Sequence, residues 1–254
     1  NSTGVGDDLE YSDLFGSALA VGDFDGDGYD DLAVGVPYED IDTETNAGAV
    51  NVIYGSATGL SGSGSELWYE EYNGLGGGAE TDDWFGWALA AGDFDRDGRD
   101  DLAIGIAGED LGAIDDAGRV VILYGTGDGL TATGSQSWQQ GLDGVWDQAE
   151  EMDRFGYTLT TGDFDGDSYA DLAIGVPHEE LVLQEDAGQV HILYGSGDGL
   201  TSTGTEVFNL ETYYADDLFG YALTAGDFDG DGFDELAVGI PGEDLNSWAD
   251  IGAV

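Results

Sequence analysis

The nonapeptide DFDGDGYDD, Asp23–Asp31, decides the interpretation of this chain because it recurs three more times. The other copies are DFDRDGRDD at 93–101, DFDGDSYAD at 163–171 and DFDGDGFDE at 227–235, and positions 1, 3, 5 and 9 are acidic in all four. Side chains two residues apart in a tight loop converge, and converging carboxylates repel one another unless a cation lies between them. Calcium takes about six to eight oxygen ligands in a flexible geometry, so each loop is a candidate calcium site.

Each loop begins like an EF-hand loop but ends differently. The residue at the twelfth position is aliphatic in every copy, so the acid at position 9 is expected to replace the missing terminal glutamate in a shorter loop. The backbone carbonyl at position 7 is a further expected ligand. We predict about one Ca²⁺ per repeat, four in total, with the following ligands: Asp23, Asp25, Asp27, Tyr29, Asp31, Asp93, Asp95, Asp97, Arg99, Asp101, Asp163, Asp165, Asp167, Tyr169, Asp171, Asp227, Asp229, Asp231, Phe233 and Glu235.

Short apolar runs flank every loop. FGSALAVG precedes the first loop and LAVGVP follows it, and the other copies keep this pattern. The runs have the length of strands, are bounded by glycine and lack a helical stripe, so they predict a strand–loop–strand unit. An acid pair then follows at 39–40, 109–110, 179–180 and 243–244. A third apolar run and a weaker fourth one complete the unit.

The repetition predicts an all-β fold. Four antiparallel strands per unit, with no helical segment, are typical of a β-propeller blade, and one such unit cannot bury its own apolar face. Residues 1–254 are therefore predicted to form a single β-propeller domain or propeller fragment, with repeats that start near 15, 85, 155 and 219. The last repeat is incomplete. The aromatic residues of the Phe-Gly pairs and of loop position 2 are in register and are expected in the core.

These motifs resemble the FG-GAP repeat family, the β-propeller of integrin α-subunit ectodomains and related bacterial surface proteins. The resemblance rests on the Phe-Gly pairs, the D-x-D-x-D-G-x-x-D loops and the GVP or GIP that stands where the family has GAP, and it extends from about Phe15 to the end. It implies calcium loops that join the first two strands of each blade on one face. The third loop departs from the pattern, with Ser168 at the position-6 glycine and Ala170 at position 8, so this site is expected to be the weakest.

The composition is extremely acidic. The chain has 55 acidic residues, four arginines and no lysine, for a formal charge of −51, and four Ca²⁺ ions would neutralise only eight of these charges. Such a surface repels nucleic acid and anionic membranes. Two interpretations stay open: halophilic adaptation to a salty medium, and acidity matched to a cationic partner. The absence of cysteine excludes disulfides and thiolate chemistry. No apolar run is long enough to cross a bilayer, so direct membrane insertion is not expected.

The number of blades in the complete ring is open. Three arrangements are compatible with the repeats: a part of a longer propeller that continues into a longer chain, self-association with a second copy, and a small four-bladed ring. In the last case the segment around Ser2–Gly4, which matches Ser202–Gly204, would complete the final blade. Propellers have about four to eight blades, so this range accommodates all three.

Catalysis is the alternative role for the acids. Paired carboxyl groups serve glycoside hydrolysis, but a catalytic site is usually unique, whereas these acids recur in register. The two histidines, His178 and His191, have no repeated partner and are interpreted as incidental. We therefore expect no enzyme. The acid pairs are interpreted mainly as solvated loop charge, with a further cation or ligand contact as the alternative.

Aromatic residues out of register mark the stretch between one blade and the next. They are Trp68, Tyr69, Tyr72, Trp138, Trp146, Tyr213 and Tyr214. This stretch also varies in length, as binding segments on a rigid scaffold do. The resemblance places these loops on the face opposite the calcium loops, where a protein or glycan ligand is expected, with outer-strand packing as the alternative. The sequence thus predicts an extracellular or cell-surface calcium-binding module for adhesion, ligand recognition or surface assembly. The alternatives are a carbohydrate-binding or carbohydrate-processing propeller and a structural subunit of a surface filament.

Overall fold

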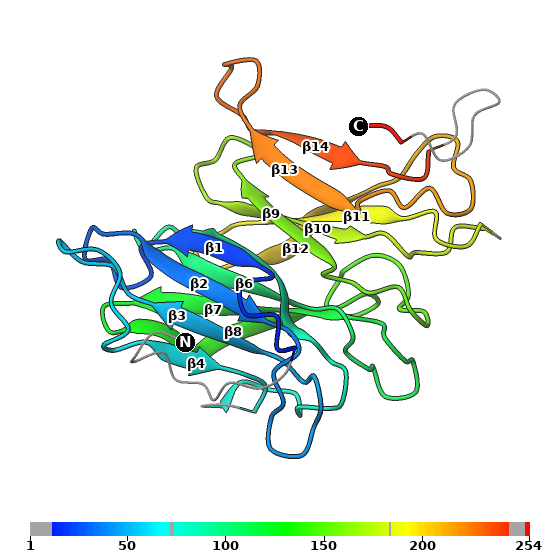
Figure 1. Cartoon of the computed structure of the whole chain (residues 1–254). Helices are drawn as coiled ribbons and strands as arrows, with labels where there is room; N and C mark the ends of the chain where they lie inside the picture. The colour runs from blue at the N-terminus through cyan, green and yellow to red at the C-terminus, as the bar shows by residue number, and fades with distance from the viewer. Residues whose placement is uncertain (1–11, 72–73, 183, 244–251) are drawn as a thin grey trace.

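The computed structural model describes residues 12–71, 74–182, 184–243 and 252–254 (Figure 1). These residues form strands joined by turns and loops, and they contain no helix long and apolar enough to span a membrane. The matching segment around Ser2–Gly4 lies outside the described residues, so its pairing stays a prediction.

The strands form four antiparallel sheets in chain order. The first is β1 (Leu19–Gly22), β2 (Asp31–Val36), β3 (Ala49–Ile53) and β4 (Glu66–Trp68); the second is β5 (Phe85–Gly92), β6 (Asp101–Ile106), β7 (Arg119–Thr126) and β8 (Gly129–Trp138). The third is β9 (Thr158–Gly162), β10 (Asp171–Val176), β11 (Gln189–Tyr194) and β12 (Thr201–Phe208). The fourth has only β13 (Ala222–Gly226) and β14 (Glu235–Gly239) among the described residues. Each sheet is one blade, as the repeats predict.

The first strands of successive blades lie next to one another. β5 packs between β1 and β9, and β9 packs against β13, so the blades fan around a common side (Figure 1). The fold is therefore an all-β propeller arrangement, as predicted, and the described residues do not close it into a ring. Each candidate calcium loop joins the first two strands of a blade, and each acid pair follows the second strand. We call the two ends of the blades the calcium-loop end and the acid-pair end.

The core consists of three layers, one between each pair of neighbouring blades. The layer between the first two blades holds Phe24, Trp68 and Phe85, and equivalent layers lie on either side of the third blade. Central strands are covered on both faces, so β6 and β10 are buried along their whole length. This explains why their sequences are continuous apolar runs rather than alternating ones.

Two repeated glycines set the distance between blades. A Cβ on Gly105 would overlap the backbone carbonyl of Gly156 in the next blade, and the pairs Gly35–Gly86 and Gly175–Gly220 repeat this contact. The glycine of each Phe-Gly pair also has a positive φ, 89° at Gly156. The Phe-Gly and GVP motifs are therefore two halves of one backbone contact between blades.

The terminal blades correct one expectation about the aromatic residues. Phe24, Phe94, Phe85 and Phe155 are fully buried and Phe219 nearly so, as predicted. One phenylalanine in each of the first and last blades differs: Phe15 is 48% exposed and Phe228 is 65% exposed. Both lie on blades that have a neighbour on one side only among the described residues, so the prediction that they are buried is wrong for this structure.

Candidate functional site

The four acidic loops bring carboxylates together as the sequence predicts. In the first and fourth loops the side chains at positions 1, 3 and 5 converge, and in the second and third loops those at positions 1, 3 and 9 do so. Within each group one oxygen per residue lies within 4.8 Å of the others. The groups are Asp23, Asp25 and Asp27; Asp93, Asp95 and Asp101; Asp163, Asp165 and Asp171; and Asp227, Asp229 and Asp231.

Backbone hydrogen bonds fold each loop around its own carboxylates. In the first loop the carboxylate of Asp23 accepts from Asp27 N at 3.0 Å and from Gly28 N at 2.9 Å. Asp25 also accepts from Asp27 N, and Asp27 accepts from Tyr29 N. These turns aim the side chains inward before any ligand binds. The backbone carbonyls at position 7 stay predicted ligands.

The acid at position 9 anchors the base of the loop. Asp101 is buried, and its two oxygens accept from Phe94 N and Gly125 N, both at 2.9 Å. Asp31 and Asp171 make the same two bonds in their blades. This residue therefore ties the loop to the end of the third strand, and it joins the converging group in the second and third loops.

The loops of neighbouring blades are bonded in series through position 8. Asp100 N donates to Asp23 O at 3.1 Å, and the Asp100 carboxylate accepts from Asp23 N at 2.9 Å. Asp234 makes both bonds to Asp163. Ala170 donates its backbone N–H to Asp93 O but has no carboxylate to complete the pair. The acid at position 8 was missed in the sequence, although it recurs in three of the four loops.

Burial, with a smaller contribution from repulsion between neighbouring carboxylates, raises the pKa of the acid at position 9. Burial raises the pKa of Asp101 to about 8, and repulsion from Asp95 and Asp93 adds to the shift. Burial and repulsion likewise raise the pKa of Asp171 to about 6. The candidate ligands are all oxygen atoms, which hard cations prefer, whereas soft metals prefer sulfur ligands. The described residues thus fit Ca²⁺, with Asp23, Asp25 and Asp27 and their equivalents in the other loops as holders of the ion.

The third loop carries the irregularity that the sequence indicates. Ser168 has a φ of 73°, where the other loops have glycines with φ of 89° to 97°. Its backbone still donates to Asp163, at 3.0 Å, so the loop keeps its turn at the cost of backbone strain.

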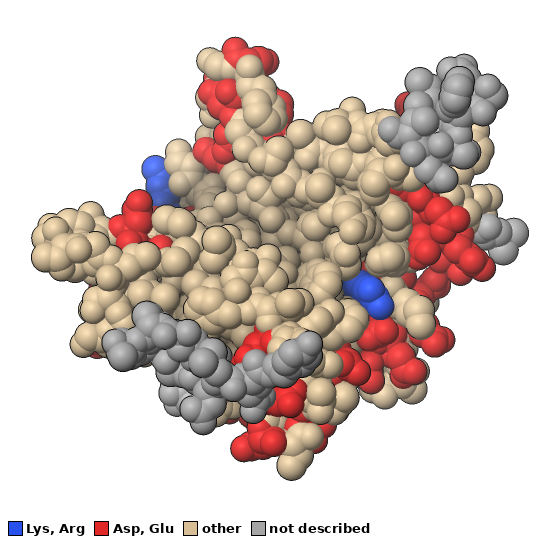
Figure 2. Space-filling view, in the orientation of Figure 1, with Lys and Arg blue, Asp and Glu red and all other residues tan. Residues whose placement is uncertain are grey.

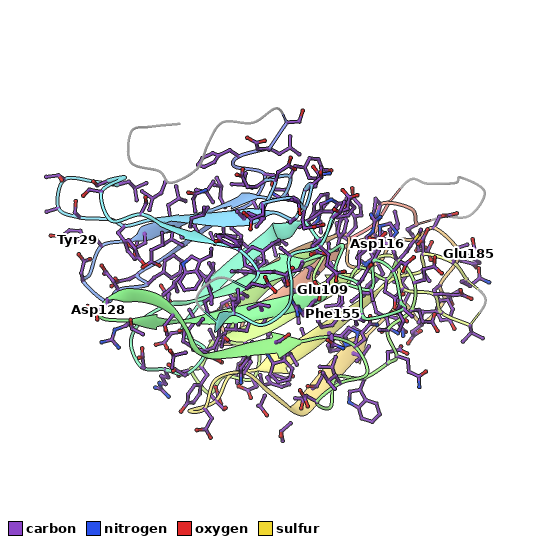
Figure 3. The ribbon with its side chains drawn as sticks, turned by 90° about the horizontal axis from the view of Figure 1, so that it is seen from below. Tyr29, Glu109, Asp116, Asp128, Phe155 and Glu185 are labelled. Carbon is purple, nitrogen blue, oxygen red and sulfur yellow. The ribbon has the colours of Figure 1, made fainter. Side chains whose placement is uncertain are left out.

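The acid pairs lie at the opposite end from the calcium loops. Figure 3 shows Tyr29 of the first loop at one end and Asp116 and Glu185, from the acid-pair segments, at the other. In Figure 2 the acidic side chains gather at the two ends, with a largely uncharged band between them. The interpretation of the acid pairs as mainly solvated loop charge is wrong for the first acid of three pairs. Glu39, Glu109 and Glu179 are buried, whereas the second acids Asp40, Asp110 and Glu180 are exposed. In the fourth pair Glu243 is half-buried, and Asp244 lies outside the described residues.

A second set of buried acids was missed. Asp83, Asp153 and Asp217 stand two residues before the Phe of the last three Phe-Gly pairs and are at most 1% exposed. The repeated D-x-F-G spacing is the signal that could have found them. They lie close enough to the acid pairs to interact: burial raises the pKa of Glu179 to about 9, with repulsion from Asp153 next, and that of Asp153 to about 7.

The partners of these buried acids differ between blades. In the second blade Arg119 pairs with Glu70 and, at 3.3 Å, with Glu109. In the third blade glutamines stand at the equivalent positions, and Gln140 Nε2 donates to Glu179 at 2.6 Å. The arginine and its glutamate are thus replaced together by neutral residues.

A row of aromatic rings crosses the acid-pair end. Trp84 lies 6.3 Å from Tyr38 and 5.3 Å from Trp87, and Tyr157 lies 5.4 Å from both Trp87 and Tyr221. We call these five residues the aromatic row. The guanidinium of Arg154 lies over the ring of Trp84 at 5.1 Å. Four members, Trp84, Trp87, Tyr157 and Tyr221, directly precede or follow a Phe-Gly pair, and these positions are not among the aromatic residues predicted for binding.

The aromatic residues predicted for binding separate into two groups. Trp68 and Trp138 are buried at 3% and 7% exposure and belong to the core, so the binding prediction is wrong for them. They end the outer strands β4 and β8, where the next blade covers them. Trp146 and Tyr214 are exposed, at 66% and 50%, and Tyr72 lies outside the described residues. His178 accepts or donates a bond with Asp186 at 3.1 Å, and His191 is fully buried.

The four repeats described above match a known protein family. A family model described as FG-GAP repeat matches residues 15–53, 85–123, 155–193 and 219–254. The chain belongs to the FG-GAP repeat family. As in the sequence, each match begins at a Phe-Gly pair and includes one acidic loop.

Relatives of this FG-GAP chain include integrin α subunits. Integrin alpha-PS2 of Drosophila melanogaster is 30% identical in an alignment that covers 96% of this chain and 16% of the relative. Integrin alpha-5 of Xenopus laevis is 31% identical over 91% of this chain and 20% of the relative. Phosphatidylinositol-glycan-specific phospholipase D of Rattus norvegicus is 33% identical over 61% of this chain and 18% of its own length. The chain therefore spans a fifth or less of these relatives.

Among solved structures, the rhamnogalacturonan lyase PL11 of Bacillus licheniformis superposes with a TM-score of 0.50 at 16% identity. The match covers 86% of this chain and 39% of the lyase. At this identity the similarity supports the fold alone.

Proposed function

We propose that this chain is a calcium-stabilised, non-catalytic recognition module of an adhesion-type protein that acts outside the cell or at its surface. The observation that carries the proposal is the recurrence of one all-oxygen donor cluster in four equivalent loops. A catalytic group is needed once per site, whereas a stabilising ion is needed once per blade. One Ca²⁺ ion in each of the four loops would offset the repulsion between the carboxylates of that loop.

Two observations support the proposed extracellular location: the type of calcium site and the similarity to integrin α subunits. Calcium modules with several modest sites suit the millimolar calcium found outside cells. The integrin α subunits to which the chain is similar are the second support.

The acid-pair end is the proposed recognition surface. It combines the aromatic row with exposed acids such as Asp40 and Asp110. Rings flanked by negative charge attract cationic groups, and the position of Arg154 over Trp84 is an intramolecular example. A partner that presents arginine or lysine fits this surface best.

Calcium dependence is tested by thermal unfolding and calorimetry. A chelator should lower the Tm substantially, and Mg²⁺ should restore little because it requires a tighter octahedral geometry. Asp93→Asn should remove about one ion from the binding stoichiometry. Asp128→Asn, an exposed acid in the neighbouring β7–β8 turn, is the control and should remove none. Overlapping melting curves with and without chelator would reject the calcium sites.

The recognition surface is tested with an immobilised arginine-rich peptide at saturating calcium. Trp87→Ser introduces the residue that stands at the equivalent place in the first blade, Ser17, and should weaken binding about threefold to tenfold. Tyr29→Ala, an exposed aromatic at the calcium-loop end, should leave the affinity unchanged. Equal loss in both variants, or loss in neither, would contradict the assignment of this surface.

A further inference from the structure

The third blade carries an open pocket on its outer strand. Trp146, Asp147, Thr205 and Val207 line a cavity of about 620 Å³, which we call the outer pocket. Trp146 and Asp147 also line an adjoining depression of about 460 Å³ with Gly141, Gly144 and Gln148. Small-molecule sites typically have volumes of about 300–1,000 Å³, so the outer pocket is large enough for a ligand.

The residues in and next to the outer pocket differ from those at the equivalent positions of the second blade. The second blade offers an internal comparison because its positions match those of the third blade with a constant offset, as the pairings Val121–Ser137 and His191–Val207 show. From the second to the third blade, Gly76 becomes Trp146, Gly77 becomes Asp147, Val121 becomes His191, Ser135 becomes Thr205 and Ser137 becomes Val207. Residues needed for the propeller recur, so five clustered departures indicate a local role.

Several buried polar groups next to the pocket lack partners among the described residues. Thr205 Oγ1, Gln189 Oε1 and both ring nitrogens of His191 are buried and make no hydrogen bond to the described residues. Buried polar atoms are nearly always satisfied, so this concentration needs an explanation. Val207, the strand partner of His191, lines the pocket, so the histidine lies beside the pocket wall on the same face of the sheet.

Asp147 is held in position for an incoming donor. Gln189 Nε2 donates to its Oδ2 at 3.0 Å and Gln148 N to its Oδ1 at 2.9 Å, and each oxygen keeps further acceptor capacity. Its φ is 74°, a left-handed conformation that is unfavourable for a residue other than glycine, and the equivalent Gly77 has a φ of 102°. The fold thus retains a strained aspartate where glycine would be easier.

We propose that the outer pocket is a subsite for a neutral glycan. The indole of Trp146, which is 66% exposed, offers a flat apolar surface for the C–H face of a sugar ring. The Asp147 carboxylate accepts from sugar hydroxyls, and the hydroxyl of Thr205 both donates and accepts. The charge of −51 disfavours uronates and other acidic saccharides, so the ligand is a neutral one. This subsite is separate from the aromatic row.

Binding is tested on the full chain at saturating calcium with tetrasaccharides of β-1,4-linked glucose, mannose and N-acetylglucosamine, and with tetragalacturonate as the acidic comparison. Tryptophan fluorescence and titration calorimetry are the measurements. At least one neutral tetrasaccharide should bind and tetragalacturonate should not. Trp146→Ala should weaken binding about tenfold or more, as the loss of a central aromatic anchor does. Asp147→Gly, which restores the residue of the second blade, should also weaken it while preserving or raising the Tm.

Two controls make the result specific. Tyr214→Ala removes an exposed aromatic from the next linker and should leave the affinity unchanged. Trp87→Ser should also leave it unchanged, which separates this site from the proposed recognition surface. Absence of binding by all neutral tetrasaccharides, or binding that persists in both Trp146→Ala and Asp147→Gly, would overturn the proposal. Binding of tetragalacturonate alone would overturn it as well.

Discussion

Position 6 of each acidic loop must adopt a left-handed backbone conformation, and three loops meet this demand with glycine. Gly28, Gly98 and Gly232 have φ between 89° and 97°, whereas Ser168 is held at 73°. The turn exists because Asp163 accepts from the backbone at this position, so the carboxylate and the conformation depend on each other. The third loop is accordingly the one that carries the strain.

Replacing this serine should relieve that strain. Ser168→Gly is expected to raise the stability by about 1 kcal/mol at saturating calcium, because glycine adopts positive φ without steric cost. Chemical denaturation measures the change. Ser63→Gly, at an exposed turn without positive φ, is the control and should be neutral or slightly destabilising. An unchanged or lower stability of the Ser168 variant would show that the loop accommodates serine freely.

Buried acids at the acid-pair end should make stability depend on pH. The pKa of Glu179 is raised to about 9, so the folded state retains a proton that the unfolded state loses near its ordinary value of 4.5. The folded state binds more protons in this window, and stability therefore falls as pH rises from about 5 to 9. Glu179→Gln should flatten this decline, measured as Tm against pH at saturating calcium. Glu180→Gln changes the exposed neighbour and should leave the slope intact; the same slope in all three proteins would contradict the assignment.

At the scale of elements, the blades are spaced by backbone contact rather than by side chains. Gly105 in β6 lies against Gly156, which lies two residues before β9 in the next blade. A larger residue at either position would push two sheets apart. The apolar layer between the second and third blades then loses the close packing that gives it its stability.

Gly105→Ala should therefore destabilise the chain by about 1–3 kcal/mol, the usual cost of overpacking. Gly127→Ala is the matched control, because a Cβ there meets no atom within 4 Å and φ is not positive. Denaturant unfolding compares the two. Similar stabilities for both variants would show that the blades can separate without loss.

Much of this architecture follows from the sequence because local signals repeat. The strand–loop–strand units, the acidic loops and the positions of their carboxylates are set by spacing within nine residues. The buried carboxyl of Glu179 could not be foreseen, because its surroundings come from the segment that leads into the third blade, including Asp153 and Gln140, which is 39 residues away. The exposure of Trp146 and the burial of Trp138 are likewise decided by which blade lies alongside, and both residues occupy aromatic positions of similar appearance in the sequence.

At the scale of the whole molecule, repulsion among the acidic residues destabilises the folded state. The net charge of −51 is spread over both ends, and Figure 2 shows acids gathered there with few basic groups to pair with them. The ion pairs among the described residues involve three arginines and one histidine, including Arg119 with Glu70. Most of the repulsion is therefore left for bound cations and solvent ions to screen.

Stability should rise steeply with NaCl at fixed excess calcium. The screening length shortens from about 10 Å at 0.1 M to about 3 Å at 1 M salt, which removes most repulsion between exposed acids. Thermal unfolding across this range checks it, with a non-ionic osmolyte of matched osmolality as the control for solvent exclusion. A flat response to salt would show that the acids are already paired with bound ions.

The position-8 bonds between acidic loops couple the candidate calcium sites in pairs. Asp100 joins the first loop to the second and Asp234 joins the third to the fourth, but Ala170 offers only a backbone bond between the second and third. Ordering of one loop is thus transmitted to one neighbour and attenuated beyond it. If the loops bind calcium, the isotherm should resolve two cooperative doublets instead of four independent events. Ala170→Asp would supply the missing carboxylate and merge the doublets into a single concerted transition.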